Sequence, residues 1–239
     1  MIATGTVINA LTVLAGGGLG ALLGQRLPER VRETVMAGLG LVTLIVGLQL
    51  ALETENVLVV LVSVLLGALL GEWWRIDVGL ERLSDWLKGR LAGRASASSL
   101  AHFNEGFITA SLVFCVGPMT ILGSLEDGLT GDYSLLAIKA VLDGFAALAF
   151  ASSLGIGVLF SVVTVVVYQG GLTLLAGLAE GVFSEAMIRE MSATGGVLVL
   201  AIGLMLLNVK QIRVANLLPS LGVVLAIVAG LEVLGIAAF

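Results

Sequence analysis

Long apolar segments are the feature of this chain that most constrains its fold. A bilayer core about 30 Å thick is crossed by about 20 mostly apolar helical residues. The segments that meet this requirement, to within a few residues at each end, are 4–25, 35–52, 56–73, 106–124, 134–152, 155–178, 192–208 and 216–237. The sequence therefore predicts an all-α, polytopic membrane protein with eight transmembrane helices.

Composition excludes the main alternatives. Of the 239 residues, 58% are hydrophobic and 12% are charged, whereas a soluble domain is about 25% charged. The net charge of -5 argues against nucleic-acid binding, and a single cysteine, Cys115, excludes a disulfide framework. Disordered and collagen-like chains are excluded as well.

The distribution of basic residues predicts the orientation, because cytoplasmic loops of membrane proteins are rich in Lys and Arg. With the N-terminus outside, the cytoplasmic loops carry Arg26, Arg30, Arg32, Arg75, Arg82, Lys88, Arg90, Arg94, Lys210 and Arg213. The external loops carry only Arg189, together with Glu53, Glu55, Glu126, Asp127, Asp132, Glu180, Glu185 and Glu190. Both termini are therefore expected on the external side. The first segment lacks a basic region before it, so it is not interpreted as a cleavable signal peptide.

The stretch 74–104 is the one substantial hydrophilic part of the chain. Apolar residues recur in it at helical spacing, at Ile76, Leu80, Leu83, Leu87 and Leu91. This pattern predicts an amphipathic helix over 76–92 in the cytoplasmic membrane interface, followed by a short connector at 95–99. A linker role is favoured over a regulatory one.

Two parts of the chain share a weak pattern at a nearly constant offset. The matches are Gly17, Gly18, Leu19, Leu22 and Gly24 with Gly170, Gly171, Leu172, Leu175 and Gly177; Gly40, Leu44, Gly47, Leu48 and Leu50 with Gly196, Leu200, Gly203, Leu204 and Leu206; and Ser63 with Ser220. Spans one to three would then repeat, inverted in the membrane, as spans six to eight. Inverted repeats are typical of secondary transporters, although a duplication kept only for packing is the alternative.

The predicted organisation is a single membrane domain, 1–239. Its parts are a first repeat (1–73), the interfacial helix and connector (74–104), a central helix pair (105–153) and a second repeat (154–239).

The fifth segment contains two ionisable residues, Lys139 and Asp143, which lie four apart and hence on one helical face. Counted from Tyr133, Asp143 lies about 15 Å into the segment, near the middle of the bilayer. An ionisable group at that depth costs several kcal/mol unless it is paired or hydrated. We therefore interpret the pair as a candidate ion or proton site, with a structural ion pair as the alternative.

The fourth segment contains Gly117-Pro118, which predicts a kink or a break because proline lacks an amide hydrogen and clashes with the preceding turn. Broken helices at membrane depth often form ion and substrate sites, and Thr120 adds a hydroxyl nearby. A simple kink is an equally good interpretation.

Other polar residues complete the candidate pathway. Asn9 and Gln169 are uncharged polar residues inside apolar segments, where they either line a path or bind neighbouring helices together. Glu126, Asp127 and Asp132 follow the fourth segment and form a candidate outer vestibule that concentrates cations, although a solvated turn is the commoner case.

Glycines at four-residue spacing predict close helix packing. They are Gly16, Gly20 and Gly24 in the first segment and Gly67 and Gly71 in the third. Such faces also make a homo-oligomer conceivable. The runs Gly16–Gly18 and Gln169–Gly171 would either pack in the same way or expose carbonyl groups to a pathway.

Enzymatic interpretations find little support. The chain has one histidine, His102, so no histidine-based metal site is expected. It contains no G-x-S-x-G, H-E-x-x-H or Walker motif. We expect no enzyme activity, no metal and no cofactor.

Several motifs stand together in an order that resembles a known family. They are Gly5-Thr-x-x-Asn9, Gly16-Gly17, Phe114-Cys-Val-Gly-Pro-Met119, Gly123-Ser-Leu-Glu-Asp-Gly128, Lys139-x-x-x-Asp143-Gly144 and Asn216-x-x-Pro219. The chain resembles, over essentially its whole length, the YqgA/YdfK-like family of bacterial inner-membrane proteins of unknown function. The resemblance implies a bacterial inner-membrane location and no substrate.

Together these observations favour a secondary transporter or ion-conducting protein for an inorganic ion or small polar solute. Few aromatic residues, 5%, argue against a large lipophilic substrate. The alternative is a non-transporting membrane scaffold or assembly protein whose 76–92 helix docks a cytoplasmic partner. A polar cavity that reaches Asp143 would favour transport, and a sealed Lys139–Asp143 pair would favour the scaffold.

Overall fold

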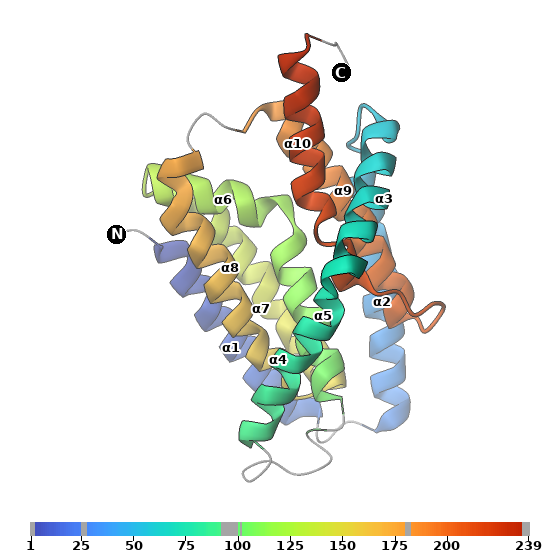
Figure 1. The fold of residues 1–239 in the computed structure, drawn as a ribbon. Helices are drawn as coiled ribbons and strands as arrows, with labels where there is room; N and C mark the ends of the chain where they lie inside the picture. The colour runs from blue at the N-terminus through green and yellow to red at the C-terminus, as the bar shows by residue number, and fades with distance from the viewer. Residues whose placement is uncertain (1–2, 25–27, 92–99, 101, 180–182, 236–239) are drawn as a thin grey trace. The chain divides into compact units, whose positions relative to one another are not determined.

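The computed structural model describes residues 3–24, 28–91, 100, 102–179 and 183–235, and these contain helices and no strand. In chain order the helices are α1 (Thr4–Gly24), α2 (Glu29–Ala51), α3 (Val57–Trp74), α4 (Ile76–Leu91), α5 (Phe103–Val116), α6 (Pro118–Leu129), α7 (Ser134–Leu154), α8 (Gly157–Ala179), α9 (Glu185–Leu206), η1 (Val214–Leu217) and α10 (Ser220–Val233) (Figure 1). The predicted all-α class is confirmed. Arg26, Arg94, the 95–99 connector and Glu180 lie outside the described residues.

Seven straight segments of the described chain are long and apolar enough to cross a membrane. They are α1, α2, α3, α7, α8, α9 and the stretch from η1 through α10. Helices α5 and α6 pass the same test only as a pair, with a bend of 61° between them. The predicted break is therefore confirmed, since α5 ends at Val116 and α6 begins at Pro118.

Two helices begin earlier than the apolar pattern predicts. Helix α2 starts at Glu29 instead of residue 35, and α9 starts at Glu185 instead of residue 192. The first turns of α9 contain Arg189 and Glu190, which were expected in an external loop. Both are paired with residues 54–56, so these charges do not end the helix.

The chain divides into two compact units. The first comprises Met1–Leu39, Leu80–Cys115 and Met119–Glu180, and the second comprises Gly40–Gly79, Val116–Pro118 and Gly181–Phe239. The first unit thus holds α1, α5, α7, α8 and most of α4 and α6. The second holds α3, α9, α10 and the larger part of α2.

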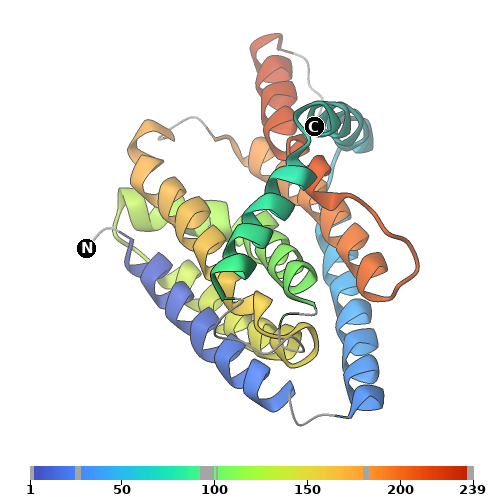
Figure 2. The ribbon, with the colours of Figure 1, turned by 60° about the horizontal axis from the view of Figure 1, so that its bottom comes forward.

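In the first unit α1 packs along α7 and α8 (Figures 1 and 2). A Cβ atom on Gly16, Gly20 or Gly24 would lie 2.0, 2.2 or 2.3 Å from a carbonyl oxygen of α7. These oxygens belong to residues 144, 148 and 152, so the two helices run parallel. The predicted role of the four-spaced glycines in close packing is therefore confirmed for α1.

In the second unit α3 packs against η1 and α10. A Cβ on Gly67 would lie 2.4 Å from Ser220 N, and one on Gly71 would lie 1.9 Å from Asn216 O. The glycine faces of α1 and α3 are therefore used inside the chain. A homo-oligomer stays a prediction.

Helix α4 confirms the helix predicted over 76–92. Its residue Leu87 joins an apolar cluster with Leu100, Phe103 and Phe107. Trp86 points away from that cluster, with 56% of its surface exposed, and the Arg90 guanidinium lies 4.8 Å from the centre of its ring. The position of α4 in the membrane interface stays a prediction.

Candidate functional site

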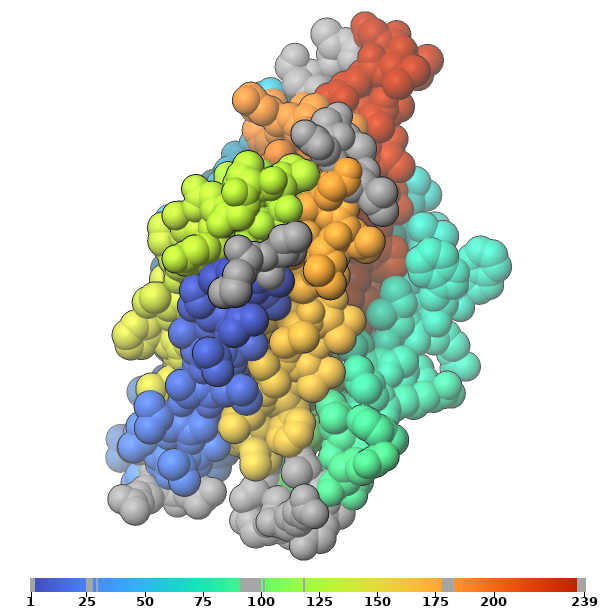
Figure 3. Space-filling view, turned by 90° about the vertical axis from the view of Figure 1, so that its left-hand side faces the viewer, coloured from blue at the N-terminus to red at the C-terminus, as the bar shows by residue number. Residues whose placement is uncertain are grey.

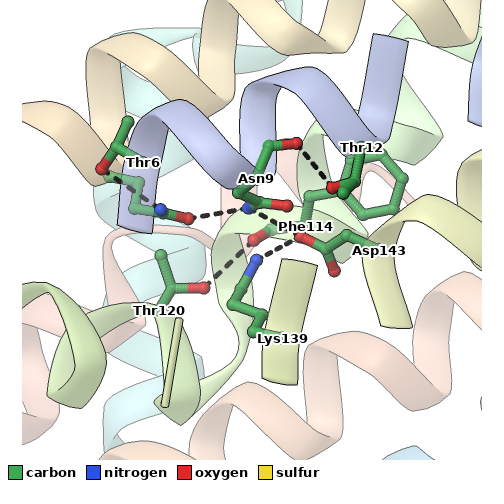
Figure 4. Close-up of polar contacts among 8 residues, drawn as sticks. Thr6, Asn9, Thr12, Phe114, Thr120, Lys139 and Asp143 are labelled. Carbon is green, nitrogen blue, oxygen red and sulfur yellow. Dashed lines mark hydrogen bonds and ion pairs between the residues drawn. The ribbon is translucent and has the colours of Figure 1, made fainter. Parts of the chain in front are cut away.

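Four polar side chains meet where α1, α7 and α8 pack together (Figure 4). We call Asn9, Lys139, Asp143 and Gln169 the polar cluster. The Lys139 ammonium donates to Asp143 Oδ2. Asn9 Nδ2 donates to the same oxygen at 2.9 Å and to Gln169 Oε1 at 2.9 Å. The structure thus brings together four of the seven residues predicted for the pathway.

The backbone explains why these four residues meet. Lys139 and Asp143 lie one turn apart on α7 and share a face. The glycine contacts hold α1 against that helix, which places Asn9 beside Asp143. Asp143 is the tenth of the 21 residues of α7, so it lies halfway along a helix long enough to span a bilayer.

The polar cluster is closed to solvent. Asn9 and Gln169 are fully buried, and Lys139 and Asp143 are 5% and 8% exposed. Gln169 Nε2 also donates to Thr6 Oγ1 at 3.2 Å, a residue that sequence reasoning missed. A threonine in the first turn of an apolar segment carries no signal that distinguishes it from a packing residue.

One atom of the polar cluster lacks a partner. Both amide hydrogens of Asn9 are used, by Asp143 and by Gln169. No described residue donates a hydrogen bond to its buried Oδ1 atom. An unmet buried acceptor costs about 1–3 kcal/mol, so this oxygen is not explained by helix packing alone.

Thr120 compensates for the proline break. Pro118 has no amide hydrogen to donate to the Phe114 carbonyl, which lies four residues before it. The Thr120 hydroxyl donates to that carbonyl instead, at 3.1 Å. Figure 4 shows both groups next to Lys139. Gly117 and Pro118 form the junction of α5 and α6, and their use as backbone ligands stays a prediction.

The three carboxylates predicted for the outer vestibule differ in their surroundings. Glu126 and Asp132 are exposed, whereas Asp127 is fully buried. Asp127 Oδ2 accepts from the Gly5 amide in the first turn of α1 at 3.0 Å, in keeping with Figure 3, which shows the end of α6 close to the start of α1. A solvated vestibule therefore fits Glu126 and Asp132 but not Asp127.

Asp132 lies between α6 and α7, and its carboxylate accepts a hydrogen bond from Ser134 N at 2.9 Å. Hydrogen bonds from Ser134 lower the pKa of the Asp132 carboxyl below its ordinary value. The carboxylate thus stays ionised at the start of α7.

A third buried carboxylate, which the sequence pattern did not predict to be buried, lies in the second unit. Glu190 is fully buried on α9. It accepts from Thr54 Oγ1 at 2.6 Å and from the backbone amides of Glu55 and Asn56 at 2.9 and 3.4 Å. The sequence placed it in an external loop, because an acidic residue near an apolar segment is normally solvated.

The chemistry available at the polar cluster is that of oxygen ligands and one ammonium. Among the described residues, no three His, Cys, Asp or Glu side chains gather to hold a metal ion. The Lys139–Asp143 ion pair is closed to solvent, which is the arrangement expected of a scaffold. The Asn9 oxygen beside a buried carboxylate has no donor among the described residues, and a bound ion or solute would account for it.

Comparisons with known proteins agree on the family. The model of the family described as "Protein of unknown function (DUF554)" matches residues 4–229. The chain is 37% identical over 219 residues to the uncharacterized protein YqgA of Escherichia coli strain K12, covering 91% of this chain and 92% of that protein. It is 30% identical over 221 residues to the uncharacterized membrane protein YdfK of Bacillus subtilis strain 168, with coverages of 91% and 92%.

No solved structure matches the chain. The family predicted from the sequence motifs is confirmed by both relatives and by the family model. The chain is an all-helical, membrane-type protein that belongs to the DUF554 family.

Proposed function

We propose that the protein is a secondary transporter or ion-conducting protein of the bacterial inner membrane, acting on an inorganic ion or small polar solute. Asp143 is the ion or proton site and Lys139 its counter-charge. The observation that carries the proposal is the buried polar cluster halfway along α7, because ionisable groups at that depth are rare and usually functional. Glu126 and Asp132 form the outer mouth.

Eight crossings with both termini outside are part of the proposal. Their support is the parallel packing of α1 and α7. Two parallel spans must be separated by an odd number of crossings. Helices α2 and α3 supply two, so the bent pair α5–α6 supplies the third.

Inverted repeats are also part of the proposal, supported by contacts within the second unit. Gly47 lies against Leu200, and its counterpart Gly203 lies against Leu44, the counterpart of Leu200. Contacts that exchange in this way are expected when two inverted copies pack about a pseudo-twofold axis.

The first unit contains an equivalent pair of contacts between α1 and α8. Gly17 lies against Leu159, and its counterpart Gly170 lies against Thr6. Leu159 and Thr6 are separated by the same offset as the two glycines. The glycine runs that sequence reasoning left open therefore include one packing contact in each copy.

In this proposal the closed polar cluster is the occluded form of an alternating-access cycle. A transporter passes through such a form when neither side has access to the site. The bend at Gly117-Pro118 gives α6 a place to move relative to α5.

The experiment is a flux assay on the purified full-length protein in liposomes, with solutes first selected by thermal stabilisation. Asp143→Asn is expected to abolish flux while the protein stays folded. Asp85→Asn, the same change at an exposed residue of α4, is the control and should retain flux. Flux of wild-type size in Asp143→Asn would remove Asp143 from the mechanism.

A scaffold is the second candidate, favoured by the exposed Trp86 with Arg90 stacked on it. Exposed aromatic and arginine residues are frequent anchors of interfaces. A scaffold predicts that Trp86→Ala abolishes the cellular phenotype while Asp143→Asn leaves it intact, whereas transport predicts the reverse.

A further inference from the structure

The first unit buries a second carboxylate, Asp127, beside the α7 turn that precedes Lys139. Gly5, whose amide donates to Asp127, lies directly against Leu136, since an added Cβ would be 2.5 Å from Leu136 Cβ. Leu136 is less than one turn before Lys139 on α7. Along α7, Lys139 thus follows the residue that Gly5 contacts by three positions and precedes Asp143 by four. No described residue donates a hydrogen bond to Asp127 Oδ1.

The buried charges of the first unit do not balance. Among its described Asp, Glu, Lys, Arg and His residues, three are buried: Asp127, Asp143 and Lys139. With both carboxylates ionised and the amine protonated, these three side chains carry a net charge of -1, which is costly away from water. One monovalent cation balances it, whereas a divalent cation would leave an excess positive charge.

The polar cluster also offers suitable ligands for such a cation. Alkali cations bind oxygen atoms, as do other hard cations. Asn9 Oδ1 is fully buried and unpartnered among the described residues, and it belongs to the amide whose nitrogen already binds Asp143. The two hydrogen bonds made by that nitrogen fix which end of the amide is the oxygen.

We propose, on the basis of the function proposed above, that a small alkali cation binds Asp143 and Asn9 Oδ1, and that Lys139 then moves from Asp143 to Asp127. Lys139 is thus a tethered competitor that occupies the carboxylate when no cation is bound. Its flexible four-carbon stem permits the change. With the cation bound, both buried carboxylates of the first unit have a positive partner.

The test is thermal unfolding of the full-length protein in detergent, with LiCl, NaCl or KCl titrated against choline chloride at constant ionic strength. A ligand that binds only the folded state raises its apparent stability in a saturable way. At least one alkali cation is expected to do so for the wild type and for the Asp85→Asn control, and none for Asp143→Asn.

The variants at Lys139 separate competition from simple ion pairing. Lys139→Gln removes the competitor and should lower the apparent Kd for the cation by about tenfold or more, since the carboxylate is then unpaired. Lys139→Arg keeps a tethered cation and should bind no more tightly than the wild type. Asp127→Asn removes the second position of Lys139 and should weaken binding by about tenfold.

The inference is overturned if none of the three cations stabilises the wild type, or if Lys139→Gln binds the cation no more tightly than the wild type. If Lys139→Gln does not fold, Asp127→Asn and Asn9→Leu decide, and unchanged affinity in both overturns the site. If flux depends on Asp143 but Lys139→Gln binds the cation no more tightly, the proposed transport function is supported and the role of Lys139 as a competitor is rejected. If the cation binds saturably but no flux is measured, the binding site is supported and the proposed transport function is rejected.

Discussion

Both units bury carboxylates, and Glu190 in the second unit and Asp143 in the first differ in the groups that stabilise them. Glu190 in the second unit accepts three hydrogen bonds from a loop, and both of its oxygens are used. Asp143 in the first unit receives its bonds at Oδ2, from a flexible ammonium and from an amide that leaves its own oxygen unpartnered among the described residues.

This difference separates a structural carboxylate from a candidate site. Backbone amides cannot leave Glu190 without unfolding the 54–56 loop, so its environment is fixed. In the proposed exchange Lys139 leaves Asp143 by a rotation of its side chain, so the same carboxylate changes partners without unfolding of the backbone. Burial alone does not distinguish the two cases.

The largest effect is expected from breaking the pair on one side only. Lys139→Met leaves an unpaired buried carboxylate and should lower the free energy of unfolding by about 3–5 kcal/mol, measured without alkali cations. The double variant Lys139→Met, Asp143→Leu should recover most of that loss. Lys88→Met on α4 serves as the control. A double variant as unstable as the single one would contradict the pairing.

Glu190→Gln should destabilise by about 2–3 kcal/mol, because an amide cannot accept from all three donors. Stabilisation by alkali cations should be unchanged, since the residue belongs to the other unit. Chemical denaturation measures the first effect, and Glu53→Gln, in the exposed part of the same loop, is the control. Lost cation binding in Glu190→Gln would erase the distinction between the two carboxylates.

Replacing a closely packed glycine by alanine should lower the free energy of unfolding by a similar amount in both units. Gly20→Ala in the first and Gly71→Ala in the second force a methyl group against a backbone oxygen and should each cost about 1–3 kcal/mol. Gly222 on α10 has nothing within 4 Å of an added Cβ, so Gly222→Ala should be neutral or stabilise by up to about 1 kcal/mol. Equal melting temperatures for all three variants would argue against the packing described.

The smallest effect concerns Asp132, which water already solvates. Its lowered pKa means that its contribution to stability is present above the unfolded pKa of about 3.9 and is lost as the pH falls through the folded value. The difference in Tm between wild type and Asp132→Asn should therefore shrink below about pH 4. A Tm difference that instead grows as the pH falls would mean that the protonated Asp132 is the stabilising form, and would contradict the hydrogen bond from Ser134.

Much of this fold could be read from local pattern. Runs of apolar residues predicted nearly every helix, and Gly117-Pro118 predicted the break between α5 and α6, because these are properties of consecutive residues. The starts of α2 and α9 were missed. Charged residues such as Glu190 ended the apolar pattern, although distant partners allow the helix to continue through them.

The candidate site shows the same division. Lys139 and Asp143 could be paired from their spacing, because a helix fixes which residues share a face. Asn9 and Gln169 were identified as polar residues in apolar segments, but their meeting at Asp143 depends on how α1 and α8 pack on α7. Local sequence is enough to place the helices and the pair. Which oxygen atoms surround that pair, and the burial of Asp127, depend on the tertiary structure, because contacts between helices depend on packing across the whole chain.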